Sequence, residues 1–594
     1  MTVHRRHTTF ATIAFLCCAA SATWAETYHV SPSPLEDVDA AVQFRKIGEA
    51  AHKVQPGDTV RIHTGTYREQ VYVPTSGTAE QPIVFEAAPA AHVVVTGADR
   101  LLDWRLEGTN EERIFSAPFP YDIKTWGGDK HYPKDDWHAL LGRMEQVFVD
   151  HYPMRQVLKR AQLSRGTFWI DEEAKRLWVW ASNNAKLGSS VEGDPPVEAS
   201  VRPLLWQQEG AHVTIRGLHF RRAGNQAQGG AVNFKGNDLL IEDCTFTENN
   251  TNGASFTGER IRVNRCTFER NGQQGWSAYR SHGLTMVDSV TRDNNTNNFN
   301  RSWEAGGNKI VMARDVVIER CTFSGNRGVG LWFDVGNENA IVRNCLIENN
   351  ENVGLFYEIS FGMHAHDNVI VGNGFESYGG AWGASGGLSI ASSPGCVIER
   401  NLIVGNKEGF QLREHLRTTP KIGDPSGTAE HPVWNRDAIV RNNTIALNRD
   451  GQIWAWFETG DLRYWPAAIQ GEMQESLAKG MVDNAEAYKA KHRGGVPDDL
   501  SLETLNLKFE NNLLWPSGKG TLWNWGLPWA KHRRYADLEA VRHELSLDSG
   551  STMAAFEFAN FPQRDFRVPA DSPALQMGAY PKGEVPGVRL GKLE

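Results

Sequence analysis

Two acidic residues, Asp334 and Glu358, stand 24 residues apart at the same place in two similar stretches of sequence. Glycine and three hydrophobic residues precede each of them, Gly-Leu-Trp-Phe before Asp334 and Gly-Leu-Phe-Tyr before Glu358. Glu304 ends a related stretch one unit earlier, and Glu414 ends another further along. We therefore expect Glu304, Asp334 and Glu358 on three successive structural units, with Glu414 on the same face.

Closely spaced carboxyl groups are suited to cleaving glycosidic bonds. A glycosidase needs one carboxyl to protonate the leaving oxygen and another as nucleophile or base, about 5–5.5 Å apart for retention and about 6.5–9.5 Å for inversion. If the units stack as β-strands, one step is about 4.8 Å and two steps are about 9.6 Å. The Asp334–Glu358 pair therefore fits retention, and the Glu304–Glu358 pair fits inversion.

The expected surroundings of these acids suggest a role for each. Burial by neighbouring rings and repulsion from Asp334 both disfavour the charged form of Glu358, so its pKa should be raised. Glu358 would then be the general acid, and Asp334, helped by Lys309, the nucleophile or base. Glu304 would position the substrate or serve as the alternative base.

Aromatic residues accompany the acids, and their planes suit the C–H faces of sugar rings. Trp303, Trp332 and Tyr357 stand directly beside acids in the sequence. Trp276, Tyr279 and Trp382 lie near the corresponding place in other units. With Arg413 and Glu414, these residues are the predicted substrate-binding set.

The acids lie within an internal repeat. Its units carry a Cys or Asn anchor after a short alternating segment, as in Ile241-Glu-Asp-Cys-Thr-Phe and Val263-Asn-Arg-Cys-Thr-Phe, and many recur every 22 to 24 residues. The anchors are Cys244, Cys266, Cys321, Cys345, Asn368, Asn401 and Asn443, and an asparagine follows each by five residues. Such units are typical of the coils of a β-solenoid, which bury a core only when stacked. We expect ladders of buried asparagines in the turns and an inward ladder of free thiols.

These repeats resemble the right-handed parallel β-helix proteins of the pectate-lyase-like superfamily. The stretch from Pro56 to Glu69, Pro-Gly-Asp-Thr-Val-Arg-Ile-His-Thr-Gly-Thr-Tyr-Arg-Glu, resembles their first coils. The resemblance covers residues 40–100 and 206–460. It implies an all-β, right-handed parallel β-helix with an N-terminal capping helix at 44–54, and an exported carbohydrate-active enzyme.

The same resemblance leaves two alternatives to a glycoside hydrolase. Lyases of this superfamily cleave uronic-acid polymers by β-elimination, with Ca2+ on acids and a Lys or Arg as base. Here Glu304, Asp334 and Glu358 could hold Ca2+ through oxygen ligands, with Lys309 or Arg413 as base. The second alternative is a non-catalytic glycan-binding β-helix. Acids confined to neighbouring coils favour an enzyme, and acids that outnumber candidate bases favour the hydrolase.

Departures from the repeat divide the chain into segments. We expect a signal peptide at 1–25, an N-terminal cap and first coils at 26–104, a β-rich insertion at 105–205, the parallel β-helix core at 206–460, a helical insertion at 461–505, and final coils with a closing segment at 506–594.

Composition and the N-terminus narrow the function further. Arg5 and Arg6 precede an apolar run from Phe10 to Ala20, a pattern typical of a secretory signal peptide, so we expect a periplasmic or extracellular protein. The formal charge of -9 argues against a nucleic-acid binder. No later apolar run approaches the roughly 20 residues that span a membrane. We expect a monomer that acts on a polysaccharide or oligosaccharide.

Overall fold

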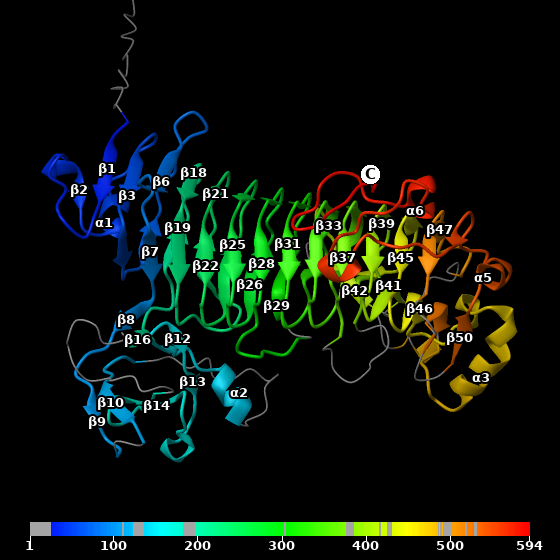
Figure 1. Cartoon of the computed structure of the whole chain (residues 1–594), viewed down its shortest axis with the longest axis horizontal. Coiled ribbons are helices and arrows are strands. Elements are labelled where there is room, and N and C mark those ends of the chain that lie inside the picture. The colour runs from blue at the N-terminus through cyan, green and yellow to red at the C-terminus, as the bar shows by residue number, and fades with distance from the viewer. Residues whose placement is uncertain are drawn as a thin grey trace, which may run out of the picture.

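In the computed structural model the protein is an elongated β-solenoid with a smaller unit attached near its N-terminal end (Figure 1). The structure describes residues 25–109, 112–122, 136–181, 197–301, 304–375, 385–414, 417–424, 430–484, 486–487, 490, 501–516, 520–527 and 531–593. Nearly all of the predicted signal peptide lies outside the described residues.

Three long sheets run along the solenoid, and successive coils add a strand to each. Sheet A has 14 strands, from β2 (Gln43–Phe44) to β47 (Lys508–Glu510). Sheet B has 13, from β4 (Gly65–Tyr67) to β51 (Thr552–Met553). Sheet C also has 13, from β5 (Val71–Val73) to β50 (His532–Tyr535). Strands pair in parallel within them, apart from β50, which pairs antiparallel with β49 (Thr521–Gly526). The predicted parallel β-helix is therefore confirmed.

Sheet C carries the predicted acids. Between β5 and β49 its strands are, in order, β17 (Trp206–Gln208), β20 (Gly230–Phe234), β23 (Asn252–Phe256), β26 (Gln274–Tyr279), β29 (Gly306–Val311), β32 (Leu331–Asp334), β35 (Leu355–Glu358), β38 (Leu388–Ala391), β41 (Glu408–Glu414) and β46 (Gly451–Phe457).

Equivalent residues of successive coils stack inside the solenoid to form one continuous core. The rings of Phe220, Phe246 and Phe268 lie 5.2 and 4.7 Å apart in a column. The predicted free thiols are confirmed for Cys244, Cys266, Cys321, Cys345 and Cys396, all of which are buried and unpaired. Buried in this way, the thiols pack as small apolar groups.

The predicted asparagine ladder is present in the turns. Asn350 Nδ2 donates to Asn373 Oδ1 at 2.9 Å and to the Phe323 carbonyl at 3.1 Å. Asn350 Oδ1 accepts from the backbone and side chain of Asn326 at 3.1 and 2.9 Å. Gly330, four residues after Asn326, makes room for the ladder, because a Cβ there would lie only 2.6 Å from Asn350 Nδ2.

The smaller unit is the predicted β-rich insertion, with its own hydrophobic core. One mixed sheet contains β13 (Arg155–Gln156), β14 (Thr167–Asp171), β15 (Arg176–Trp180), β10 (Ile114–Pro118) and β9 (Arg105–Leu106). An antiparallel sheet contains β12 (Tyr152–Pro153), β11 (Val147–Val149), β16 (Val197–Ser200) and β8 (Ala98–Arg100). The second sheet joins the insertion to the solenoid, since β8 leaves the first coils and β16 leads into β17.

The α-helices among the described residues are short. They are α1 (Ile47–Ala51), α2 (Asp136–Leu141), α3 (Gln470–Ala478), α5 (Leu538–Leu545) and α6 (Pro573–Gln576). The capping helix is shorter than predicted because β2 occupies residues 43–44. No helix among the described residues has the length and apolar character needed to cross a membrane.

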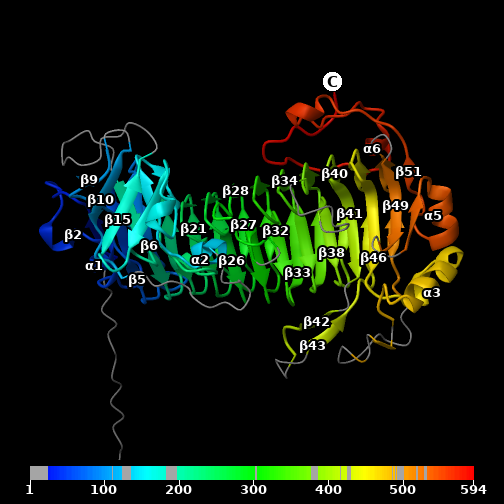
Figure 2. The same ribbon diagram turned by 90° about the horizontal axis from the view of Figure 1, so that it is seen from below.

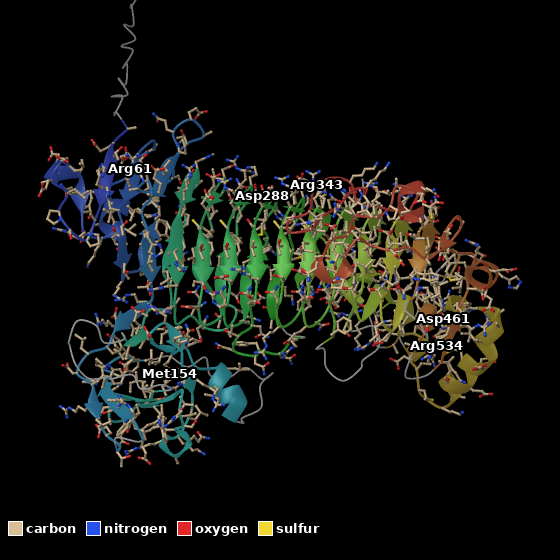
Figure 3. All side chains as sticks on the ribbon, in the orientation of Figure 1. Arg61, Met154, Asp288, Arg343, Asp461 and Arg534 are labelled. Atoms are coloured by element: carbon tan, nitrogen blue, oxygen red, sulfur yellow. The ribbon has the colours of Figure 1, made fainter. Side chains whose placement is uncertain are left out.

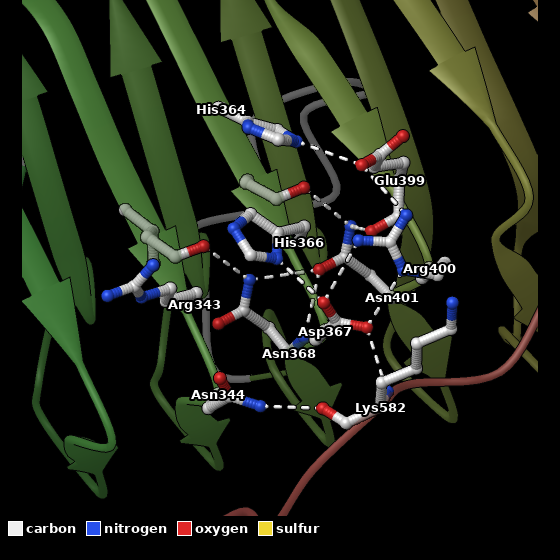
Figure 4. Close-up of polar contacts among 12 residues, drawn as sticks. Arg343, Asn344, His364, His366, Asp367, Asn368, Glu399, Arg400, Asn401 and Lys582 are labelled. Carbon is white, nitrogen blue, oxygen red and sulfur yellow. Dashed lines mark hydrogen bonds and ion pairs between the residues drawn. The ribbon is translucent and has the colours of Figure 1, made fainter.

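The C-terminal segment, residues 554–593, runs back along the solenoid over sheet B (Figures 1 and 2). Phe566 and Val568 join a hydrophobic cluster with Val369 and Leu402 of the coils. Figure 4 shows its polar anchors: the Lys582 amide donates to Asp367 at 2.8 Å, and Asn344 Nδ2 donates to the Lys582 carbonyl at 2.8 Å.

Ion pairs line the edge where sheets A and B meet, where Figure 3 labels Asp288 and Arg343. Asp288 pairs with Arg320 at 2.8 Å, and Arg343 pairs with Glu319 at 2.7 Å. Each pair joins neighbouring coils, so this edge adds polar contacts between coils outside the core.

We predict that Asn350→Ala lowers the free energy of unfolding by about 1–3 kcal/mol, because the change leaves buried ladder groups without partners. Chemical denaturation followed by circular dichroism measures the loss. Asn352→Ala is the control, since Asn352 is partly exposed and accepts a hydrogen bond only from the next amide. Equal losses for the two variants would contradict a structural role for the ladder.

Candidate active site

Asp334 and Glu358 lie side by side on the outer face of sheet C. The pairing of β32 with β35 aligns Leu331 with Leu355, Trp332 with Phe356 and Phe333 with Tyr357. The next step of this register places Asp334 beside Glu358, about 4.8 Å away along the solenoid. Because Leu331 and Phe333 point into the core, alternation turns Trp332 and Asp334 outward.

Lys309 holds Asp334 from the preceding strand, β29. Its Nζ lies 2.7 Å from Asp334 Oδ2 and 3.6 Å from Glu304 Oε1, and sits 4.3 Å above the Trp332 ring. The other oxygen, Asp334 Oδ1, is buried and has no hydrogen-bond partner among the described residues. A buried carboxylate oxygen without a partner is costly, and this atom retains its capacity to accept a hydrogen bond.

Glu358 has the raised pKa that its position predicts. Burial, and then repulsion from Asp334, raise the pKa of Glu358 to about 7. Arg417, Arg413 and Lys309 oppose the shift, and Arg417 Nη1 lies 3.2 Å from Glu358 Oε1. The carboxyl group can therefore hold or release a proton near neutral pH.

The prediction for Glu304 is wrong in its register. Val311 of β29 pairs with Asp334, whereas Glu304 precedes the strand. The loop before β29 is long, so matching by residue pattern misplaced the strand by seven positions. Glu304 reaches the site only through Lys309, and the stacked Glu304–Glu358 pair needed for inversion is absent.

The prediction for Glu414 is also wrong, by one residue. Glu358 aligns with Ala391, and Ala391 aligns with Arg413, so Arg413 shares the row of the acids. Glu414, one position later, is buried and accepts from the Asn435 amide at 2.9 Å. Burial raises the pKa of Glu414 to about 8.

With this geometry established, comparison with known proteins identifies the architecture. A family model described as a right-handed β-helix region matches residues 204–299 and 290–386. The chain is similar to the solved structure of XylC in complex with xylose, with a TM-score of 0.60 and 16% identity over 84% of this chain and 86% of that one.

The chain is a right-handed parallel β-helix protein. A second structure, titled as a glycoside hydrolase, gives a TM-score of 0.42 and 12% identity over 85% of this chain and 98% of that one. A search of curated proteins found no match. These similarities describe the fold, and the chemistry of the β-helix is judged from its own residues.

Two predicted substrate-binding aromatics belong to the core of the β-helix instead. Trp276 is fully buried and donates from Nε1 to Thr291 at 3.1 Å. Tyr357 is also fully buried, and its hydroxyl donates to the Gly362 carbonyl at 2.8 Å. Both predictions are wrong because the alternation of the strands turns these rings inward.

Other aromatics do face the acids. Trp332 stacks on Phe356 with ring centroids 5.7 Å apart, and Arg413 lies 4.7 Å above the Phe356 ring. Tyr279 is 49% exposed and aligns with Val311 in the row of the acids. Trp303 and Trp382 lie outside the described residues.

Sequence reasoning missed Phe356 and Arg417. Phe356 stands two residues before Glu358, so strict alternation would have placed it on the acid face. Arg417 belongs to a hairpin of β42 (Arg417–Pro420) and β43 (Glu430–Val433) that leaves sheet C after β41. It lies outside the repeat, and no sequence signal connects it to Glu358.

The residues present do not fit the predicted Ca2+ site. Lys309 Nζ occupies the position between Glu304 and Asp334 that a shared cation would need. No cluster of three or more His, Cys, Asp or Glu side chains suited to a metal occurs among the described residues.

We predict that Glu414→Gln becomes more stable relative to the wild type as pH rises. Because the pKa of Glu414 is raised in the folded state, this residue contributes fully to folding stability below the usual glutamate pKa. The contribution is lost as pH rises through about 8. Melting temperatures of both proteins at pH 6 and pH 9 measure the effect. The same difference at both pH values would show that Glu414 does not titrate in this range.

Proposed function

We propose that the protein is a retaining glycoside hydrolase in which Asp334 is the nucleophile and Glu358 is the general acid and then the general base. The register that places Asp334 beside Glu358 is the observation that carries this proposal. One strand step of about 4.8 Å approaches the roughly 5–5.5 Å between carboxyls in retaining enzymes.

The charges around the pair support this division of roles. Glu358 is protonated over a useful pH range because burial and the charge of Asp334 raise its pKa to about 7. Lys309 Nζ lies 2.7 Å from Asp334 Oδ2 and so pairs with the carboxylate proposed as the nucleophile. The stacked rings of Trp332 and Phe356, only 5% and 7% exposed, give the acid pair an apolar flank.

The reaction then takes two steps. Asp334 attacks the anomeric carbon as the glycosidic C–O bond breaks, and Glu358 gives its proton to the leaving oxygen. Esterified Asp334 no longer carries a charge, so the pKa of Glu358 falls and its carboxylate becomes a base. Glu358 takes a proton from water, whose oxygen attacks the anomeric carbon and releases Asp334.

The substrate is an oligosaccharide or polysaccharide that reaches an exported enzyme. The structural neighbour XylC was solved with xylose, so aryl xylosides are sensible first substrates among a panel of aryl glycosides.

We predict that Glu358→Gln loses most activity on glycosides with poor leaving groups but keeps more on activated aryl glycosides, which need less protonation. Asp334→Asn should fail on both. Steady-state kinetics on paired substrates measure this, with Glu319→Gln as a control acid on the far edge of the solenoid. Near wild-type rates for both variants on every active substrate would place the chemistry elsewhere.

We also predict that kcat/KM falls as pH rises through about 7, because Glu358 loses the proton it must donate. The reducing sugar released in the second step should initially have the anomeric configuration of the substrate, as followed by NMR. An inverted product would contradict the nucleophilic role of Asp334.

One observation favours β-elimination as a second candidate. Burial lowers the pKa of Arg413 to about 10, which makes this guanidinium easier to deprotonate than an exposed one. Elimination gives an unsaturated, ultraviolet-absorbing product from a uronic-acid polymer, whereas hydrolysis gives only a new reducing end. Product analysis on neutral and acidic glycans, with and without a chelator, separates the two.

A further inference from the structure

Three tryptophans line the outer face of the hairpin formed by β14 and β15 in the insertion. Trp169 pairs across the strands with Trp178, and Trp180 pairs with Thr167. The residues between them, including Phe168 and Val179, point into the core of the insertion. The indoles therefore lie on the side facing away from that core.

The rings form a partly exposed aromatic surface. The centroids of Trp169 and Trp178 lie 6.1 Å apart, and the Arg160 guanidinium lies 4.0 Å above Trp178. Trp178 is only 8% exposed, whereas Trp169 and Trp180 are partly exposed. Indole planes with hydrogen-bonding groups beside them match the C–H faces and hydroxyls of a sugar chain.

The indole N–H groups add an independent indication of a ligand. Nε1 of Trp178 and Nε1 of Trp180 are both buried, and neither has a hydrogen-bond partner among the described residues. Buried donors are usually paired, and each unpaired donor costs about 1–3 kcal/mol. A sugar hydroxyl would supply the missing acceptor once the atoms that cover these donors move aside.

Packing within the insertion does not account for all three rings. Its buried cluster contains none of them, and Trp169 and Trp180 remain partly exposed. The sheet that joins the insertion to the solenoid is the other one, which contains β8 and β16.

We propose that the outer face of β14 and β15 is a second saccharide-binding surface that holds a neutral polysaccharide chain. The choice of a saccharide rests on the proposed function of the acid pair. A neutral chain is favoured because the Arg160 guanidinium is stacked on Trp178, and Arg176 lies 3.8 Å from Glu107 and 2.5 Å from Ser116 Oγ. The formal charge of -9 also repels a polyanion.

The position of the insertion fits an anchor for a long substrate. β16 leads into β17, and β32 lies five strands further along sheet C, or about 24 Å. Figures 1 and 2 show the insertion projecting from the side of the solenoid where the strands of sheet C are seen. One chain could lie on the indoles and still reach the acids.

Affinity electrophoresis tests the proposal without requiring turnover. The full chain carrying Asp334→Asn is run in native gels that contain xylan, mixed-linkage β-glucan or polygalacturonate. We expect at least one neutral glycan to retard it, and the added pair Trp169→Ala and Trp180→Ala to weaken apparent association at least tenfold. The pair leaves Trp178 and its contact with Arg160 in place, and melting temperatures check the fold.

Trp104→Phe is the matched control, because Trp104 also belongs to the insertion but packs against its core and donates to the Leu101 carbonyl at 3.1 Å. It should be retarded like its parent. The proposal is overturned if no neutral glycan retards the protein, if only polygalacturonate does, or if the paired change has no effect. Full activity of Asp334→Asn would instead overturn the proposed catalytic function, and the gel result would still decide the binding surface.

Discussion

The hydrogen-bonded stacking of each coil on the next is the constraint on which the rest of this structure depends. It holds equivalent residues about 4.8 Å apart along the whole solenoid. The buried asparagines enforce this spacing in the turns, since each bonds to the turns on either side, as Asn350 does to Asn326 and Asn373. The separation of Asp334 and Glu358, which lie on adjacent coils, is therefore set by the spacing of the backbone strands.

The same stacking creates an electrostatic cost that the site uses. Two acids on neighbouring strands repel each other, and burial makes their charges costlier still. Lys309 offsets the charge of Asp334, while Glu358 holds its proton until about pH 7. The two carboxyl groups therefore have unlike surroundings, since Asp334 pairs with Lys309 and Glu358 is buried beside Asp334.

Segments that break the repeat supply what a regular solenoid lacks. The β42–β43 hairpin brings Arg417 to Glu358, and the insertion presents tryptophans on a face turned away from its own core. The C-terminal segment covers apolar side chains on sheet B, a face that the coils alone would leave in contact with water. Regular coils thus set the spacing of equivalent residues, and the segments outside the repeat add contacts to the acid pair and cover for sheet B.

The sequence by itself determined the solenoid, the buried asparagine and cysteine ladders, and the pairing of Asp334 with Glu358. These features follow from the regular spacing of similar residues along the chain. That spacing can be recognised in the sequence wherever successive coils have the same number of residues. The positions of Glu304 and Glu414 were mispredicted because strand register across an irregular loop depends on pairing between coils, which residue patterns do not record.

Only the tertiary structure decided which aromatic rings lie on the same face as the acid pair. Tyr357 and Trp276 were misassigned because a one-residue step reverses the direction of a side chain in a strand. The approach of Arg417 to Glu358, separated by 59 residues, also lay beyond the sequence. Such a contact depends on how a segment outside the repeat folds in three dimensions. The repeat pattern carries no information about that fold.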